Sequence, residues 1–213
     1  NITDYTDVQC ICEGLKRNKT LKKLDLSKNS ITDVQSIVEL LKANNTLTEL
    51  DLHCNNIHEV QSINEGLKRN NTLKKLNLRD NDIIDVQSIG ETLKAGNNTL
   101  KILDLSSSII WGWGRFNDDD WHGVSIKFVK SIGNALKTNN ILTKLIVRNN
   151  NITDVQSIGE MLKKNNTLKS LDLGYNNITD IQSIGDALKT KKSLTRLYLN
   201  NNNIFDVQSI GEG

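Results

Sequence analysis

The sequence predicts an α/β solenoid: a right-handed arc of about seven strand–helix units of 26 residues, with a parallel sheet on its concave face and helices on its convex face. One observation is a repeat, because the pattern L-x-x-L-x-L-x-x-N-x-I recurs seven times with little variation. The other is composition, because the 213 residues include 28 Leu and 23 Ile but nine aromatic residues and no proline. A core that fills one slot repeatedly with Leu or Ile needs few rings, and proline would disrupt either element.

The first leucines of the seven copies lie 26, 26, 27, 42, 26 and 26 residues apart. In the first copy, Leu24 and Leu26 alternate with polar residues, which predicts a short strand with one apolar face. After it, Val34, Ile37 and Leu41 follow the i, i+3, i+7 spacing of one helix face. Each copy therefore supplies one strand and one helix, and each buries its apolar face only against its neighbours.

The ends of each expected helix also carry signals. Thr32 and Gln35 have the spacing of a capping box, which predicts the start of the first such helix. The pair Asn44 and Asn45 precedes the next strand and predicts a left-handed turn at the end of the helix. Equivalent residues recur in later units.

These motifs resemble those of the leucine-rich-repeat family, and their helical units and "LKxNxTLxxLDLSxNxI" wording are similar to the ribonuclease-inhibitor-like subfamily, also seen in nucleotide-binding immune receptors. The resemblance covers essentially the whole chain outside one insertion. Repeats of that subfamily run longer between strand and helix, so the curvature here is expected to differ. The resemblance implies a ladder of asparagines whose side chains satisfy backbone groups between units. Its positions here are Asn29, Asn55, Asn81, Asn150, Asn176 and Asn202, with Ser108 in the fourth unit.

An insertion at residues 111–126 gives the fourth unit 16 extra residues and holds all three tryptophans of the chain. Insertions in repeats form loops on one rim, often the binding rim. Its rings either anchor a partner or fold back over the break at Ser108 as a satellite core. Its last part is expected to extend the next helix, because Val124 and Phe128 are spaced i, i+4. The candidate partner-binding residues are Trp111, Trp113, Arg115, Phe116 and Trp121.

The outward strand positions form a second candidate surface. Most carry charges of both signs, which predicts a solvated and self-paired ladder of little binding energy. Apolar and aromatic side chains on a rigid sheet suit a protein-binding patch instead. The residues of this kind are Ile102, Ile146, Tyr175 and Tyr198.

The charge balance, 27 basic against 25 acidic residues, gives no electrostatic footprint for nucleic acid or lipid. No apolar run reaches the roughly 18 residues of a membrane span. His53 lies beside Cys54 without a third catalytic partner, and we expect no enzyme activity, cofactor or metal site. The expected partner is therefore another protein, with neither nucleic acid nor membrane as an alternative.

The leading hypothesis is a non-catalytic recognition scaffold that uses the concave face and the insertion. The resemblance leaves two alternatives. One is a regulator of an enzyme, of GTPase-activating or inhibitor type, with Arg115 or Arg148 placed at the partner's active site. The other is a ligand-sensing segment of an immune-type receptor.

We expect a single domain over residues 1–213 that is a fragment of a longer array. Residues 2–18 lack the strand of their unit and residues 204–213 begin another helix, so we expect further repeats or end-to-end contacts with a partner to cover these uncapped ends. Three cysteines are too few for a disulfide scaffold and favour a reducing, cytoplasmic location. Eight N-x-S/T sequons leave secretion open, although five of them fall in the same helix-to-strand turn and follow from the repeat. The eight begin at Asn1, Asn18, Asn44, Asn70, Asn97, Asn151, Asn165 and Asn177.

Overall fold

The computed structural model of the chain describes residues 5–83, 86–94, 99–107, 118–190 and 192–205. In these residues seven strands form one parallel sheet in sequence order. The strands are β1 (Lys23–Asp25), β2 (Glu49–Asp51), β3 (Lys75–Asn77), β4 (Ile102–Asp104), β5 (Lys144–Ile146), β6 (Ser170–Asp172) and β7 (Arg196–Tyr198). The helices are α1 (Tyr5–Arg17), α2 (Gln35–Ala43), α3 (Gln61–Arg69), α4 (Val86–Lys94), α5 (Asp118–Leu136), α6 (Gln156–Leu162) and α7 (Gln182–Thr190).

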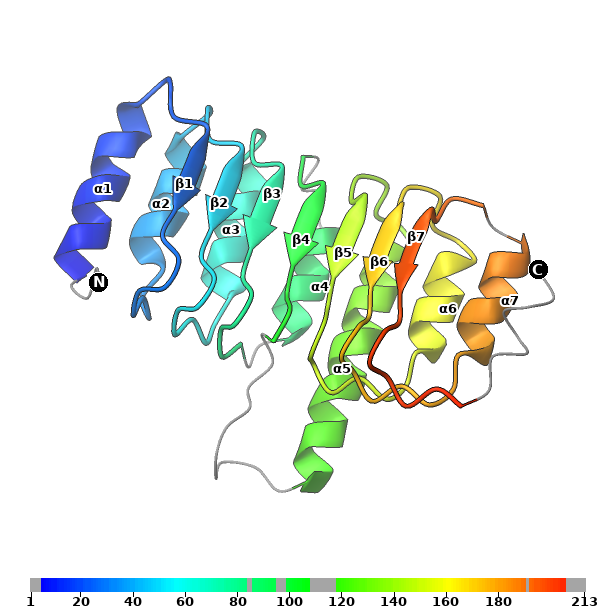
Figure 1. Ribbon diagram of the computed structural model, residues 1–213. Coiled ribbons are helices and arrows are strands. Elements are labelled where there is room, and N and C mark those ends of the chain that lie inside the picture. The colour runs from blue at the N-terminus through cyan, green and yellow to red at the C-terminus, as the bar shows by residue number, and fades with distance from the viewer. Residues whose placement is uncertain (1–4, 84–85, 95–98, 108–117, 191, 206–213) are drawn as a thin grey trace.

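All of these helices lie on one face of the sheet (Figure 1). Equivalent residues of successive units pair directly, so that Leu24 lies beside Leu50 and Leu50 beside Leu76. Neighbouring strands are about 4.8 Å apart and packed helices about 8–10 Å apart, so the sheet forms the shorter, concave side. The predicted fold class is confirmed.

Helix α5 is 19 residues long, because the end of the insertion extends it as predicted. Its first turns project beyond the neighbouring helices (Figure 1). Phe128 occupies the position that Asp33 has before α2, and because α5 continues through it, the ring packs inside. Phe128 is 1% exposed and is the largest fully buried side chain of the described residues.

The helix starts differ from the predicted capping boxes. Helix α2 begins at Gln35 with Val34 at the N-cap, and no side chain caps it there. Instead Oδ1 of Asp33 accepts a hydrogen bond from the Gln35 backbone N–H at 2.8 Å, and α6 and α7 begin in the same way. The prediction of a box starting at Thr32 is therefore wrong. Val34 must enter the core just before the helix begins, which delays the start beyond the reach of Thr32.

The helix ends also differ from the prediction. Asn44 and Asn70 have extended backbones, with φ of −83° and −81°, so the predicted left-handed turn at these asparagines is wrong. The left-handed residues lie mainly in the turn that follows each strand, where the chain must bend sharply. They are Lys28, Cys54, Asp80, Ser107, Asn149, Tyr175 and Asn201, with Asn151 in addition.

The asparagines of the repeat motif lie between successive turns. Nδ2 of Asn55 donates to the carbonyl oxygens of Leu26 at 3.0 Å and Leu52 at 2.9 Å, while its Oδ1 accepts from the N–H of Ile31 at 3.1 Å. Each such side chain thus satisfies backbone N–H and C=O groups of the buried turns that would otherwise have no hydrogen-bond partner. Side chains at the same position elsewhere also donate to backbone carbonyls: Asn29, Asn81, Asn150, Asn176 and Asn202.

A second set of asparagines lies in the helix-to-strand turns. Nδ2 of Asn70 donates to the carbonyl oxygens of Leu41 at 2.8 Å and Asn44 at 3.2 Å. Its Oδ1 accepts from the N–H groups of Thr72 and Leu73 at 3.0 and 2.8 Å. The residues that bond in this manner are Asn44, Asn70, Asn139 and Asn165. Carbonyls at the ends of α1, α2, α4 and α5 are thereby satisfied by the following unit.

Candidate protein-binding surface

Aromatic side chains emerge on the concave face over the last three strands. Ile146, Asp172 and Tyr198 pair in register across β5, β6 and β7. Tyr198 is 43% exposed, and Tyr175, in the turn after β6, is 50% exposed. We call Ile146, Arg148, Asp172, Tyr175 and Tyr198 the tyrosine patch.

Arg148 holds the centre of the tyrosine patch. Its Nη1 lies 3.0 Å from Oδ2 of Asp172, and its Cζ lies 4.8 Å from the centroid of the Tyr175 ring. Oδ1 of Asp172 accepts a further hydrogen bond from the Gly174 N–H at 3.0 Å. The guanidinium is thus fixed by an ion pair and a cation–π contact, and it fixes the ring in turn.

Ile102 and Ile146 are half-buried, in contrast to the two exposed tyrosines. Ile102 lies between Lys75 and Lys144 in the register of the sheet. Long side chains on strands about 4.8 Å apart cover much of a shorter neighbour. Ile102 therefore offers less apolar surface than its outward position suggests.

The insertion is the other predicted surface. Four of its predicted binding residues lie outside the described residues: Trp111, Trp113, Arg115 and Phe116. The prediction that their rings are either exposed or packed falls on the same segment. Trp121 belongs to α5, of which only the backbone is described at that residue.

Polar groups gather around Cys54 on units two and three. His53 Nδ1 lies 2.9 Å from Asp51 Oδ1, and the Cys54 thiol donates to Asp80 Oδ2 at 3.5 Å. Burial, followed by the hydrogen bond to Asp80, raises the pKa of Cys54, so the thiol stays protonated at neutral pH. Burial raises the pKa of Cys12 to about 11. Neither thiol is an activated nucleophile.

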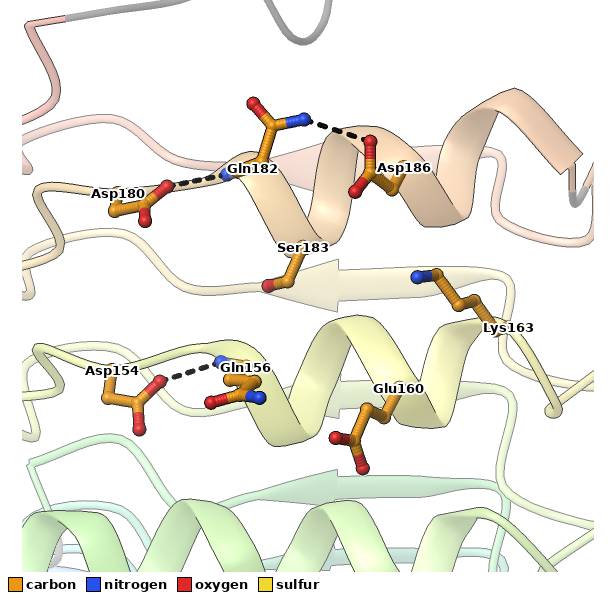
Figure 2. Close-up of a pocket in the computed structure, with 8 residues that line it drawn as sticks. All are labelled: Asp154, Gln156, Glu160, Lys163, Asp180, Gln182, Ser183 and Asp186. Carbon is orange, nitrogen blue, oxygen red and sulfur yellow. Dashed lines mark hydrogen bonds between the residues drawn. The ribbon is translucent and has the colours of Figure 1, made fainter.

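A hollow of about 390 Å³ lies between α6 and α7 on the convex face (Figure 2). Four carboxylates line it, from Asp154, Glu160, Asp180 and Asp186. Asp154 and Asp180 each accept from a glutamine N–H, Asp186 accepts from the Gln182 side chain, and Glu160 accepts from Lys137. These carboxylates are engaged within the fold, and among the described residues no three or more His, Cys, Asp or Glu side chains are placed so that they could hold a metal ion together.

Comparisons with known proteins agree with this architecture. A family model described as Leucine Rich repeats (2 copies) matches residues 142–184, and one described as Leucine Rich repeat matches residues 17–34, 43–59 and 69–86. The chain is similar in fold to an internalin C2 from Listeria monocytogenes, with 20% identity, a TM-score of 0.54, and 96% of this chain and 79% of that chain covered. For an internalin (inlF) from the same bacterium the identity is 18%, the TM-score 0.42, and the coverage 92% of this chain and 59% of that one. None of the curated proteins compared with the chain matches it.

The chain therefore contains leucine-rich repeats in the segments that these models match, and its parallel-sheet solenoid has the leucine-rich-repeat fold. Proteins of this class generally serve as scaffolds for protein interaction. Within the part of the chain that the structure describes, no helix combines the length and apolar character needed to cross a membrane.

Proposed function

We propose that the chain is a non-catalytic recognition module that binds another protein through the tyrosine patch, assisted by the insertion at residues 111–126. The observation that carries this proposal is the exposure of Tyr175 and Tyr198 on a sheet whose other outward side chains are mostly charged or polar, apart from the half-buried Ile102 and Ile146. Tyrosine and arginine are enriched among the residues that dominate binding energy at protein interfaces. Because Arg148 already holds the Tyr175 ring, little side-chain entropy remains to be lost on binding.

The role of an enzyme regulator has less support. An arginine that acts at a partner's active site needs a free guanidinium, whereas Arg148 is bound to Asp172 and covers Tyr175. Arg115 remains the candidate for that role. A ligand-sensing segment of an immune-type receptor would use the same concave face, so it is a special case of the recognition proposal. The ribonuclease-inhibitor-like assignment is supported by the nine-residue helices α2, α3, α4 and α7 on the convex side.

The tyrosine patch can be removed by residues that the repeat itself uses. Tyr175→Asn introduces the residue found at the equivalent positions 149 and 201, and Tyr198→Asp introduces that found at 172. We expect the double variant to melt like the wild type and to bind its partner at least about tenfold more weakly. Affinity capture from the native source, quantified by mass spectrometry, identifies proteins lost with the patch, and titration of the purified partner gives the Kd.

The matched control is Phe205→Thr, because Phe205 is 85% exposed outside the tyrosine patch and the equivalent positions 32, 153 and 179 carry Thr. This variant should retain the partner. Deletion of residues 111–126 tests the contribution of the insertion separately. A partner held equally by the wild type and by the double variant would contradict the proposed function.

We also propose a cytoplasmic location, supported by the turn asparagines. Asn44, Asn70 and Asn165 begin sequons, yet they are 4%, 5% and 3% exposed, and the Nδ2 that would carry a glycan donates to backbone carbonyls. A glycan at these positions is incompatible with the turn. If the chain is forced through a glycosylating secretory pathway, we expect its folded fraction to carry glycan at exposed Asn177 and none at these three, as measured by glycopeptide mass spectrometry. Folded protein glycosylated at Asn70 would contradict this reasoning.

A further inference from the structure

Ser170 carries a buried hydroxyl that has no hydrogen-bond partner, which is the one such side-chain atom among the described residues. The residue is 1% exposed and lies on β6, where it alternates with the inward Leu171 and so faces the concave side. Buried polar groups are nearly always satisfied, and leaving one unpaired destabilises the fold. The hydroxyl therefore needs a ligand or another explanation.

Two cations flank this hydroxyl. In the register of the sheet Ser170 lies between Lys144 on β5 and Arg196 on β7. With strands about 4.8 Å apart, the two long side chains rise on either side of the short serine, roughly 10 Å from each other at their bases. Neither forms an ion pair with any described residue. Their charges remain available to a ligand above the hydroxyl.

The neighbouring acid does not neutralise these cations. Asp172 faces the same side two residues along β6, and its carboxylate is bonded to Arg148 and to the Gly174 N–H. The negative charge of Asp172 is therefore compensated by Arg148 and the Gly174 N–H, and not by Lys144 or Arg196. The position as a whole combines two unpaired positive charges with a hydroxyl donor at its floor. Tyr198 lies two residues beyond Arg196 on β7 and neighbours Asp172 in register.

We propose that Lys144, Ser170 and Arg196 form a carboxylate-binding slot that receives an acidic residue of the protein partner while the tyrosine patch receives its apolar side chains. The proposal rests on the proposed function. The long side chains beside Ser170 move apart to admit the carboxylate, because they bury the hydroxyl in the free chain. Ser170 Oγ then donates to one carboxylate oxygen, and the two cations compensate the charge. Charge-assisted hydrogen bonds of this kind are the strong ones, and such pairs specify the register of an interface.

The slot is tested on the folded chain by NMR, with the blocked dipeptide Ac-Glu-Glu-NH2 as the probe and Ac-Gln-Gln-NH2 as its neutral match. We expect saturable chemical-shift changes of the backbone amides of residues 144, 170 and 196 with the acidic dipeptide and not with the neutral one. Ser170→Ala should weaken this binding about fivefold to tenfold, and Arg196→Gln at least as much. Lys75→Gln removes the same charge from the equivalent position on β3 and should leave the affinity unchanged.

The melting temperature separates a binding role from a structural one. Because Ser170→Ala removes an unpaired buried hydroxyl, it should raise the melting temperature of the chain while it lowers the affinity for the acidic dipeptide. A lower melting temperature for Ser170→Ala than for the wild type would overturn the proposal of a carboxylate-binding slot. Equal affinity of the wild type for both dipeptides would overturn it too. If Tyr175→Asn with Tyr198→Asp loses the partner but Ser170→Ala keeps full partner affinity, the slot fails and the proposed function stands. If the acidic probe binds through Ser170 but the tyrosine variant keeps the partner, the proposed function fails instead.

Discussion

Asn55→Asp is expected to destabilise the fold by about 3–5 kcal/mol, the cost of an uncompensated buried charge, at neutral pH. The substitution exchanges the Nδ2 donor for an oxygen that faces the carbonyls of Leu26 and Leu52. Asn55 is 4% exposed, so water cannot replace the lost bonds. The negative carboxylate would be buried against the partly negative oxygens of these two carbonyl groups, which costs free energy. Urea unfolding followed by circular dichroism measures the loss.

The control lies one residue away. Asn56 is exposed, and Asn56→Asp should change the free energy of unfolding by less than about 0.5 kcal/mol. Burial raises the pKa of an aspartate at position 55 above its value in the unfolded chain, so native protein binds the proton more readily. The deficit is therefore full at neutral pH and shrinks as the pH falls toward 4. Equal losses for the two variants, or a deficit that grows on acidification, would contradict the role of Asn55.

The repeat period made the fold predictable, because a leucine pattern that repeats without slippage sets both the strands and their register. The extension of α5 was predictable for a similar reason, since Val124 and Phe128 continue a helical spacing. The helix starts were not, because Thr32 and Asp33 both suit an N-terminus and the core position of Val34 decides between them.

Contacts between units were harder to predict than the units themselves. Arg148, Asp172 and Tyr175 come from two units, and their contact depends on the left-handed backbone of Tyr175, with φ of 55°. The alignment of units alone could have suggested the neighbours of Ser170, because residues 144, 170 and 196 share one position. Its burial follows from the length of the side chains beside it, which hydropathy does not register.

The helices are held together by glycines that face serines, a feature the motif analysis missed. A Cβ on Gly159 would lie 2.4 Å from the carbonyl oxygen of Ser183, and one on Gly133 would lie 2.8 Å from that of Ser157. Asn64 takes this place on α3, where it donates to the Ser88 carbonyl at 2.5 Å. A small apolar gap remains beside Asn64, between α3 and α4.

Gly159→Ala is accordingly expected to destabilise the fold by about 2–4 kcal/mol, because overpacking at a backbone contact forces α6 away from α7. Gly14→Ala is the matched control, since nothing lies within 4 Å of a Cβ at that position of α1. There the better helix propensity of alanine should stabilise the protein by about 0.5–1 kcal/mol. As measured by calorimetry, Gly159→Ala should thus lower the melting temperature, whereas Gly14→Ala should raise it.

Because strand spacing is fixed by hydrogen bonds, the separation of the helices determines how strongly the sheet curves. Helices α5, α6 and α7 lie on the convex side, on the face of the sheet opposite the tyrosine patch (Figure 1). Gly159→Ala should therefore weaken partner binding from the opposite face, because moving α6 away from α7 changes the angle between β5 and β6, the strands of the same two units. Partner affinity unaffected by Gly159→Ala, in a variant with the expected loss of stability, would show that the patch tolerates a change of curvature and acts through its side chains alone.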